Sequence, residues 1–120
     1  MNGVKQLQEV DFRKEVLDAD LPVLVDFFAP WCGPCRALTP VLEGVAKAYA
    51  GRLKVVKVNV DDAQQLAVNY SIRSVPTLMF FKEGEVVDTF IGLPPANALR
   101  AKLDAVASAP ARESVCGCSV

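Results

Sequence analysis

Two cysteines separated by two residues, Cys32 and Cys35, are the side chains most suited to chemistry in this sequence. They lie where an apolar run over residues 23–29 passes into a helical pattern that starts near Pro34. A thiol at the start of a helix is close to unpaired N–H groups and to the helix dipole, which both favour the reactive thiolate. Cys35 follows one turn later, is expected to lie deeper, and can reach the sulfur of Cys32. The spacing therefore predicts a redox pair in which one thiol attacks and the other resolves.

The same spacing also occurs in half of a zinc site, so metal binding is the alternative to redox chemistry. However, Trp31 and Pro34 occupy positions where a zinc knuckle usually has flexible polar residues. The sequence has no histidine, and its two other thiols, Cys116 and Cys118, lie close to its end. The redox interpretation is therefore favoured and no metal site is expected. A site that uses all four cysteines remains the metal-binding alternative.

Asp26 is the one charged residue in the apolar run that leads to the cysteines. Burial among Val25, Phe27 and Phe28 would raise its pKa toward the range of a proton acceptor, and a position beneath Cys35 is plausible. The alternative is a structural carboxylate paired with Lys57, which lies in an apolar stretch on the next predicted strand. The two roles are compatible, because a paired aspartate can still relay a proton through water.

Pro76 stands at the start of another predicted strand. A proline there is often only an edge residue. The segment around it, Ser74-Val75-Pro76-Thr77, could instead hold a cis peptide bond and present the backbone of Val75 to an extended substrate. The residues alone leave both possibilities open.

Hydrophobic periodicity predicts the elements that must position these side chains. Strands are expected over residues 4–7, 23–29, 53–60, 76–81 and 85–91, the last two joined by a tight turn at Glu83-Gly84. Helices are expected from Asp11 as N-cap to about residue 18, over 34–49 with Pro40 inside and Gly51 just beyond, from an Asp61-Asp62 cap to about Tyr70, and from Pro94-Pro95 through 107. The chain should form an α/β domain with a mixed sheet covered by helices.

Composition limits the classes of function. The chain has 120 residues, a formal net charge of −1 and no basic run, so it is expected not to bind nucleic acid. No apolar stretch approaches the ~20 residues of a membrane span, and residues 1–5 have no apolar leader, so no membrane contact and a cytoplasmic location are expected. Residues 1–107 are expected to form the domain, and the small, polar, aperiodic residues 108–120 a flexible tail.

The motifs in this sequence resemble those of the thioredoxin family. Asp26, Trp31-Cys32-Gly33-Pro34-Cys35, Lys57, Val75-Pro76-Thr77, Gly84 and Gly92 occur in the family's order and spacing, over roughly residues 4 to 107. The resemblance implies a thioredoxin fold, with about five strands in a central mixed sheet and about four flanking helices. It also implies a monomeric protein-disulfide reductase, usually classed as an electron carrier, that needs no cofactor besides the Cys32–Cys35 disulfide.

The resemblance further implies a role for each matching residue. Cys32 would attack a client disulfide, and Cys35, deprotonated with help from Asp26, would release the product. Lys57 would balance the charge of Asp26, and a cis Pro76 would pack against the cysteines. A thioredoxin reductase would reduce the pair again. The client-docking patch would consist of Trp31, Gly33, Pro34, Val75, Ile91, Gly92 and Leu93.

The sequence departs from the family at two places: Phe28 stands where many members have tryptophan, and Cys116-Gly117-Cys118 has no counterpart in the core family. The last helix should run away from the active cysteines for roughly 20 Å. Residues 108–116 extend at most about 30 Å, so the tail thiols could just reach Cys32 in the same molecule. The tail could act as an auxiliary redox relay, bind metal or scavenge thiols, or have no role.

Three rivals to a dithiol reductant remain at this point. One is an oxidant or isomerase, against which proline rather than histidine between the cysteines argues. Another is a binding module whose surface only clamps a partner. The third is a tail-assisted metal-binding protein. Both active-site thiols are present, so clamping would be an addition to catalysis rather than a replacement.

Overall fold

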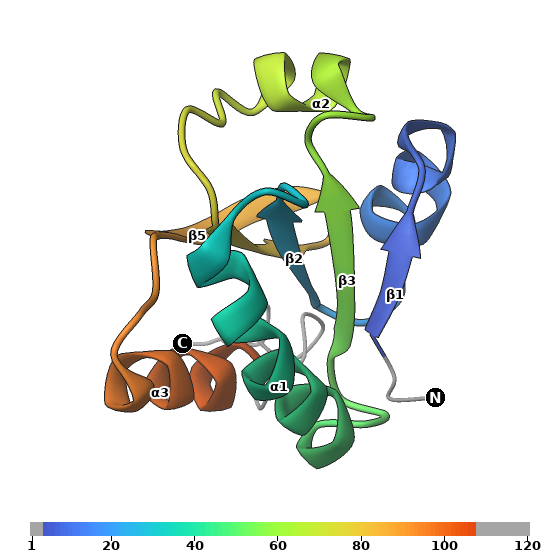
Figure 1. The fold of residues 1–120 in the computed structure, drawn as a ribbon. Helices are drawn as coiled ribbons and strands as arrows, with labels where there is room; N and C mark the ends of the chain where they lie inside the picture. Colours follow the sequence, from blue (N-terminus) through green and yellow to red (C-terminus); the bar gives the residue numbers. More distant parts are fainter. Residues whose placement is uncertain (1–3, 108–120) are drawn as a thin grey trace.

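The computed structural model describes residues 4–107, which form one five-stranded sheet with helices on both faces (Figure 1). The strands are β1 (Val4–Leu7), β2 (Val23–Phe28), β3 (Lys54–Asn59), β4 (Thr77–Lys82) and β5 (Glu85–Ile91), in the order β1-β3-β2-β4-β5. β1, β3 and β2 are parallel, whereas β4 and β5 are antiparallel to their neighbours. The expected mixed sheet is confirmed.

Four helical segments flank the sheet. The first combines η1 (Glu9–Asp11) and η2 (Arg13–Leu17), and the others are α1 (Gly33–Ala48), α2 (Gln64–Asn69) and α3 (Ala96–Ala107). Pro40 lies inside α1, which continues past it as the periodicity predicted. No helix within residues 4–107 is both long and apolar enough to cross a membrane.

β2 is buried on both faces because each face of the sheet has its own core. Val23, Val25 and Phe27 point into a cluster with the helical segment before β2 and with Leu66 of α2. Leu24 points the other way, into a cluster with α1 and α3. The period of two along a strand sends alternate residues to opposite faces, and Asp26 and Phe28 share the α1 side with Leu24. The sequence therefore places Asp26 in the interior, on the side where α1 begins.

Three expected helix ends are wrong, each for a local reason. The first helix begins earlier than predicted, with Gln8 rather than Asp11 as N-cap; Asp11 is its third residue and accepts a bond from the Gln8 N–H at 3.3 Å. α2 begins at Gln64 after Ala63, so Asp61 and Asp62 do not cap it. α1 ends at Ala48, one residue before the expected end, with Tyr49 as its C-cap. Gly51, with φ of +84°, therefore lies one residue further beyond the helix than expected.

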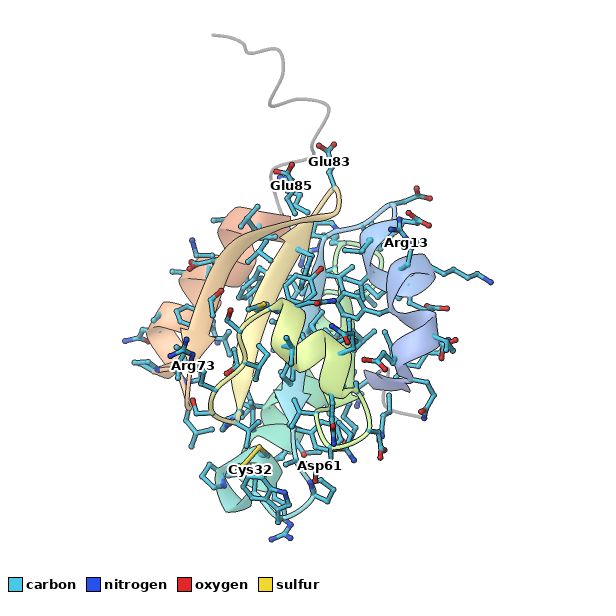
Figure 2. All side chains as sticks on the ribbon, turned by 90° about the horizontal axis from the view of Figure 1, so that it is seen from above. Arg13, Cys32, Asp61, Arg73, Glu83 and Glu85 are labelled. Atoms are coloured by element: carbon cyan, nitrogen blue, oxygen red, sulfur yellow. A yellow bond between two sulfur atoms is a disulfide. The ribbon has the colours of Figure 1, made fainter. Side chains whose placement is uncertain are left out.

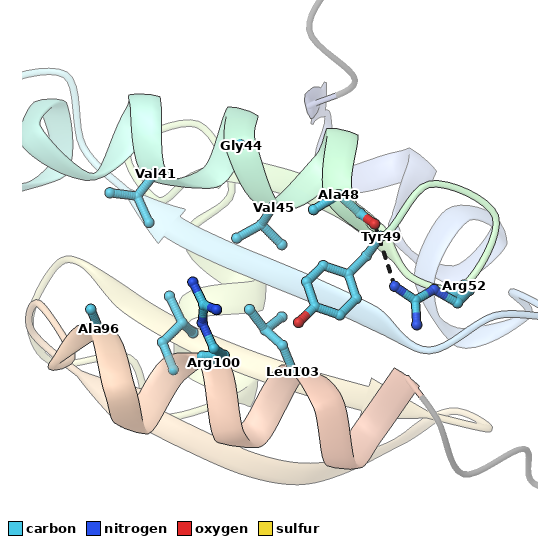
Figure 3. A pocket seen from close by; sticks show the side chains of 10 residues that line it. Val41, Gly44, Val45, Ala48, Tyr49, Arg52, Ala96, Arg100 and Leu103 are labelled. Atoms are coloured by element: carbon cyan, nitrogen blue, oxygen red, sulfur yellow. Dashed lines mark hydrogen bonds between the residues drawn. The ribbon is translucent and has the colours of Figure 1, made fainter.

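α1 and α3 lie side by side on one face and leave a groove of about 390 Å³ between them (Figure 3). The groove exists because small residues face it: Gly44 and Ala48 from α1 and Ala96 from α3. At one end the hydroxyl of Tyr49 donates a hydrogen bond to Asp104. This bond and the shared apolar cluster hold α3 against α1.

Candidate active site

The two cysteines are joined in a disulfide at the beginning of α1, at the end of the molecule where Asp61 also lies (Figure 2). Their Cα atoms are 5.3 Å apart. Cys32 is the N-cap of α1, and its Sγ accepts a hydrogen bond from the backbone N–H of Cys35 at 3.1 Å. A donor aimed at this sulfur, together with the positive end of the helix dipole, would stabilise a thiolate once the disulfide is reduced. The predicted position of Cys32 at the start of the helix is confirmed.

The expectation that Cys35 lies deeper than Cys32 needs correction. In the disulfide form each cysteine is 4% exposed, so depth does not distinguish them. Their surroundings do. Cys32 caps the helix and packs with Ala29 and Val75, whereas Cys35 also lines a cavity of about 190 Å³ that leads to Asp26. Only Cys35 of the pair therefore has a route to the buried carboxyl.

Asp26 is 3% exposed, and its Oδ1 accepts no hydrogen bond from any residue that the structure describes. Burial raises the pKa of Asp26 to about 7, and the positive charge of Lys57 opposes this rise. Asp26 and Lys57 are register partners on β2 and β3 and line the same cavity as Cys35. The structure thus brings together the three residues that the sequence proposed for proton transfer.

Lys57 does not sit on the carboxylate as a simple ion pair would require. Its Nζ lies over the ring of Phe28, 5.1 Å from the ring centroid. The same cavity is also lined by Arg36 and Thr39 of α1. Sequence reasoning missed both residues, and the only signal for them is their position one and four residues after Cys35.

Pro76 is fully buried, and the Val75–Pro76 peptide bond is cis. Of the two interpretations left open for this proline, the cis form is therefore the observed one. The carbonyl of Pro76 accepts a hydrogen bond from the N–H of Gly92 at 2.8 Å, and Val75 packs against the two cysteines. Gly92 adopts a φ of +85°, which suits a residue without a side chain. These contacts place the loop before β4 and the end of β5 beside the disulfide.

The residues predicted to form a docking patch lie at or next to the ends of α1, β4 and β5, near the disulfide. Exposed fractions are 68% for Trp31, 74% for Ile91 and 51% for Leu93, large values for apolar side chains. Gly33 and Pro34 are also exposed, whereas Val75 and Gly92 are half-buried. Exposed apolar groups at one end of a protein are typical of an interaction surface.

Sequence reasoning missed a second part of this surface, a groove of about 300 Å³ beside Trp31 and Val75. Its other lining residues come from the residue that follows β3, from α2 and from the loop before Pro76: Val60, Gln64, Ala67, Val68, Ile72, Arg73 and Ser74. The indole N–H of Trp31 donates to Oδ2 of Asp61 at 3.1 Å. The sequence held only a weak signal, the apolar Val68 in a short helical segment, and the structure shows this residue to be 71% exposed.

The thiols of Cys116 and Cys118 lie outside the described residues. Within residues 4–107, no group of three or more histidine, cysteine, aspartate or glutamate side chains is arranged to hold a metal ion. The metal-binding alternative that uses all four cysteines therefore depends on residues that the structure does not describe.

Known proteins are similar to this chain over most of its length. The family profile described as thioredoxin matches residues 3–105. The thioredoxin of Porphyra purpurea is 52% identical over 102 residues, which are 85% of this chain and 95% of that protein. Thioredoxin 1 of Nostoc sp. is 51% identical over 104 residues, 87% of this chain and 97% of the relative. The thioredoxin of Haemophilus influenzae is 44% identical over 99 residues, which are 82% of this chain and 92% of that protein.

The residues that match the family profile include the sheet, the disulfide, Asp26 and the cis Pro76, and therefore the whole site described above. A cysteine pair at a helix start, above a buried carboxyl and beside a cis proline, is a dithiol–disulfide redox centre. The chain belongs to the thioredoxin family, and its Cys32–Cys35 pair makes it a thiol–disulfide oxidoreductase.

Proposed function

We propose that the protein reduces disulfide bonds in client proteins, with Cys32 as the attacking thiol and Cys35 as the resolving thiol. The observation that carries this assignment is the asymmetry of their surroundings. Cys32 caps α1 and has a backbone N–H at its sulfur, whereas Cys35 lines the cavity that contains Asp26. The first arrangement stabilises a thiolate, and the second offers a proton acceptor.

The reaction has two exchange steps. The Cys32 thiolate attacks one sulfur of the client disulfide, the client S–S bond breaks, and the leaving sulfur takes up a proton. Cys35 then loses its proton and attacks Sγ of Cys32. The mixed disulfide breaks, the second client sulfur leaves as a thiol, and the Cys32–Cys35 disulfide forms. Two electrons pass from the dithiol to the client.

We propose Asp26 as the group that accepts the Cys35 proton, through water in the cavity. A pKa of about 7 leaves a substantial fraction of both protonation states at neutral pH, which suits a group that accepts and returns protons. Lys57 moderates the cost of the charged form. Pro76 acts by holding Val75 beside the disulfide rather than by moving protons.

We propose that clients bind as extended segments across Val75, with apolar side chains against two surfaces. One is the patch of Trp31, Gly33, Pro34, Val75, Ile91, Gly92 and Leu93 from the sequence prediction. The other is the groove along α2. Both surround the disulfide and are largely apolar, and the exposed indole of Trp31 joins them.

The working context follows from the same assignment. We propose that a thioredoxin reductase returns the electron pair, that residues 1–107 act as a monomeric domain in the cytoplasm, and that no nucleic acid, membrane or metal takes part. Residues 108–120 are proposed as a tail whose Cys116 and Cys118 exchange with the active pair. A variant with both tail cysteines changed to serine should then differ from the unchanged protein in redox potential or reductase kinetics.

The test of the central proposal is trapping of the intermediate. The full chain with Cys35→Ser, reduced and mixed with a disulfide-bonded protein such as insulin, should accumulate a mixed disulfide at Cys32 that mass spectrometry can locate. Cys32→Ser is the matched control and should trap far less. If Cys35 is the residue found linked to the client when both are available, the assignment of roles is wrong.

A strongly oxidising couple would instead favour the oxidant or isomerase alternative. Equilibration of the Cys32–Cys35 pair with a series of glutathione buffers measures this directly. The proposal expects the disulfide to persist even in strongly reducing glutathione mixtures, because no histidine lies between the cysteines to stabilise the dithiol form.

A further inference from the structure

Phe28, the last residue of β2, borders the cavity beneath the disulfide and faces a cation. Nζ of Lys57 lies 5.1 Å from the centroid of its ring. A phenyl ring attracts an ammonium group over its face because the face carries partial negative charge, and distances up to about 6 Å are effective. Phe28, Lys57 and Asp26 line the same cavity. Lys57 therefore has two groups to which its charge is attracted, a ring and a carboxyl.

The geometry shows which of the two the ammonium contacts. Asp26 and Lys57 are register partners on adjacent strands, close enough for a lysine side chain to reach the carboxyl. Nevertheless, Oδ1 of Asp26 accepts no hydrogen bond from Lys57 or any other described residue. Phe28 is two residues beyond Asp26 on the same face of β2. The ring thus lies beyond the carboxyl along the strand, where the ammonium is found.

We propose that Phe28 is a positioning residue, whose ring holds the ammonium of Lys57 away from the carboxyl of Asp26 so that this carboxyl can gain and lose a proton. The use of that proton by Cys35 rests on the function proposed above. The electrostatic arrangement itself does not, because it concerns only these three side chains.

The other groups that surround Asp26 leave Lys57 as the cation whose position matters. From α1, Arg36 lines the cavity, but its Nη2 donates to the carbonyl of Pro30 at 2.9 Å. From β4, the register partner of Asp26 is the apolar Leu78. Cys35 is held in the disulfide in this state and does not titrate. Burial raises the pKa of Asp26, and Lys57 is the group that lowers it.

Titration of the Asp26 carboxyl carbon by NMR in the oxidised full chain tests the proposal without a client or a reductase. Phe28→Leu keeps an apolar side chain but removes the ring, so the ammonium should move to the carboxyl. The midpoint should then fall by about half a pH unit or more. Phe28→Trp is the matched control, because it keeps a ring face, and should leave the midpoint unchanged or raise it.

A double variant shows whether Phe28 acts on Asp26 by positioning Lys57 or by changing the polarity of the cavity. Lys57→Met should raise the midpoint, and Phe28→Leu added to it should cause no further change, because the ring acts through the lysine. The proposal is overturned if Phe28→Leu leaves the midpoint unchanged or raises it, or if it lowers the midpoint equally in the Lys57→Met background. It is also overturned if Phe28→Trp lowers the midpoint as Phe28→Leu does. If the unchanged protein fails to reduce a client disulfide while the midpoints shift as expected, the proposed function is contradicted and this arrangement stays intact.

Discussion

The buried carboxyl of Asp26 makes the stability of this protein depend on pH in a way that one substitution should reveal. Burial raises the pKa of Asp26 from its usual 3.8 to about 7 in the folded chain. Between these two values the folded chain keeps the proton and the unfolded chain loses it. The unfolded chain therefore binds fewer protons, and the free energy of unfolding falls as pH rises through this window.

The magnitude follows from the width of the window. A difference of about 3 pH units, at about 1.4 kcal/mol per unit, corresponds to about 4 kcal/mol of lost stability above pH 7. Asp26→Asn imitates the protonated carboxyl and does not titrate. The variant should match the unchanged protein near pH 3 and be more stable by up to about 4 kcal/mol at pH 8.

Urea unfolding of both oxidised proteins at several pH values from 3 to 9 measures this difference. Asp20→Asn, at an exposed position, controls for the general loss of a negative charge. The stability difference for Asp26→Asn should grow between pH 4 and 7 and then level off. A difference that does not change with pH, or a variant that is less stable at pH 8, would refute the reasoning.

Further predictions concern a turn, an ion pair and the docking surface. Gly84→Ala should lower stability by about 1–2 kcal/mol in urea unfolding, because φ is +81° and a Cβ would lie 3.3 Å from the Leu17 carbonyl oxygen. Glu15→Gln removes a 2.6 Å ion pair to Lys54 that lowers the pKa of Glu15. The loss should be below about 1 kcal/mol at pH 7, begin to shrink as pH falls below the usual pKa of 4.5, and disappear once pH lies below the lowered pKa of Glu15 in the folded chain. Val68→Asp should raise KM for a protein disulfide and leave reduction of a small aromatic disulfide unchanged, because only the protein reaches the α2 groove.

Local patterns were sufficient for the sheet and most of the helices. β2 was predictable because its residues are apolar on both faces, which is typical of a central strand. The hairpin was predictable from Glu83-Gly84, both of which adopt positive φ. The starts of the first helix and of α2 were not predictable, because a carboxylate near a helix start can lie inside the first turn, as Asp11 does, or accept a hydrogen bond from outside the helix. Asp61 accepts its bond from Trp31 rather than capping α2.

The sequence by itself determined the reactive pair and its redox chemistry, because the spacing of Cys32 and Cys35 and the start of a helix are local features of the chain. It also identified Asp26 as a buried carboxyl, because a charged residue in the middle of an apolar strand is buried when the strand is. Only the tertiary structure decided how these parts meet. The cavity joins Asp26 to Cys35, Lys57 contacts Phe28, and Val75 packs on the disulfide. The physical reason is that pairing of strands and packing of α1 set distances between residues far apart in the chain.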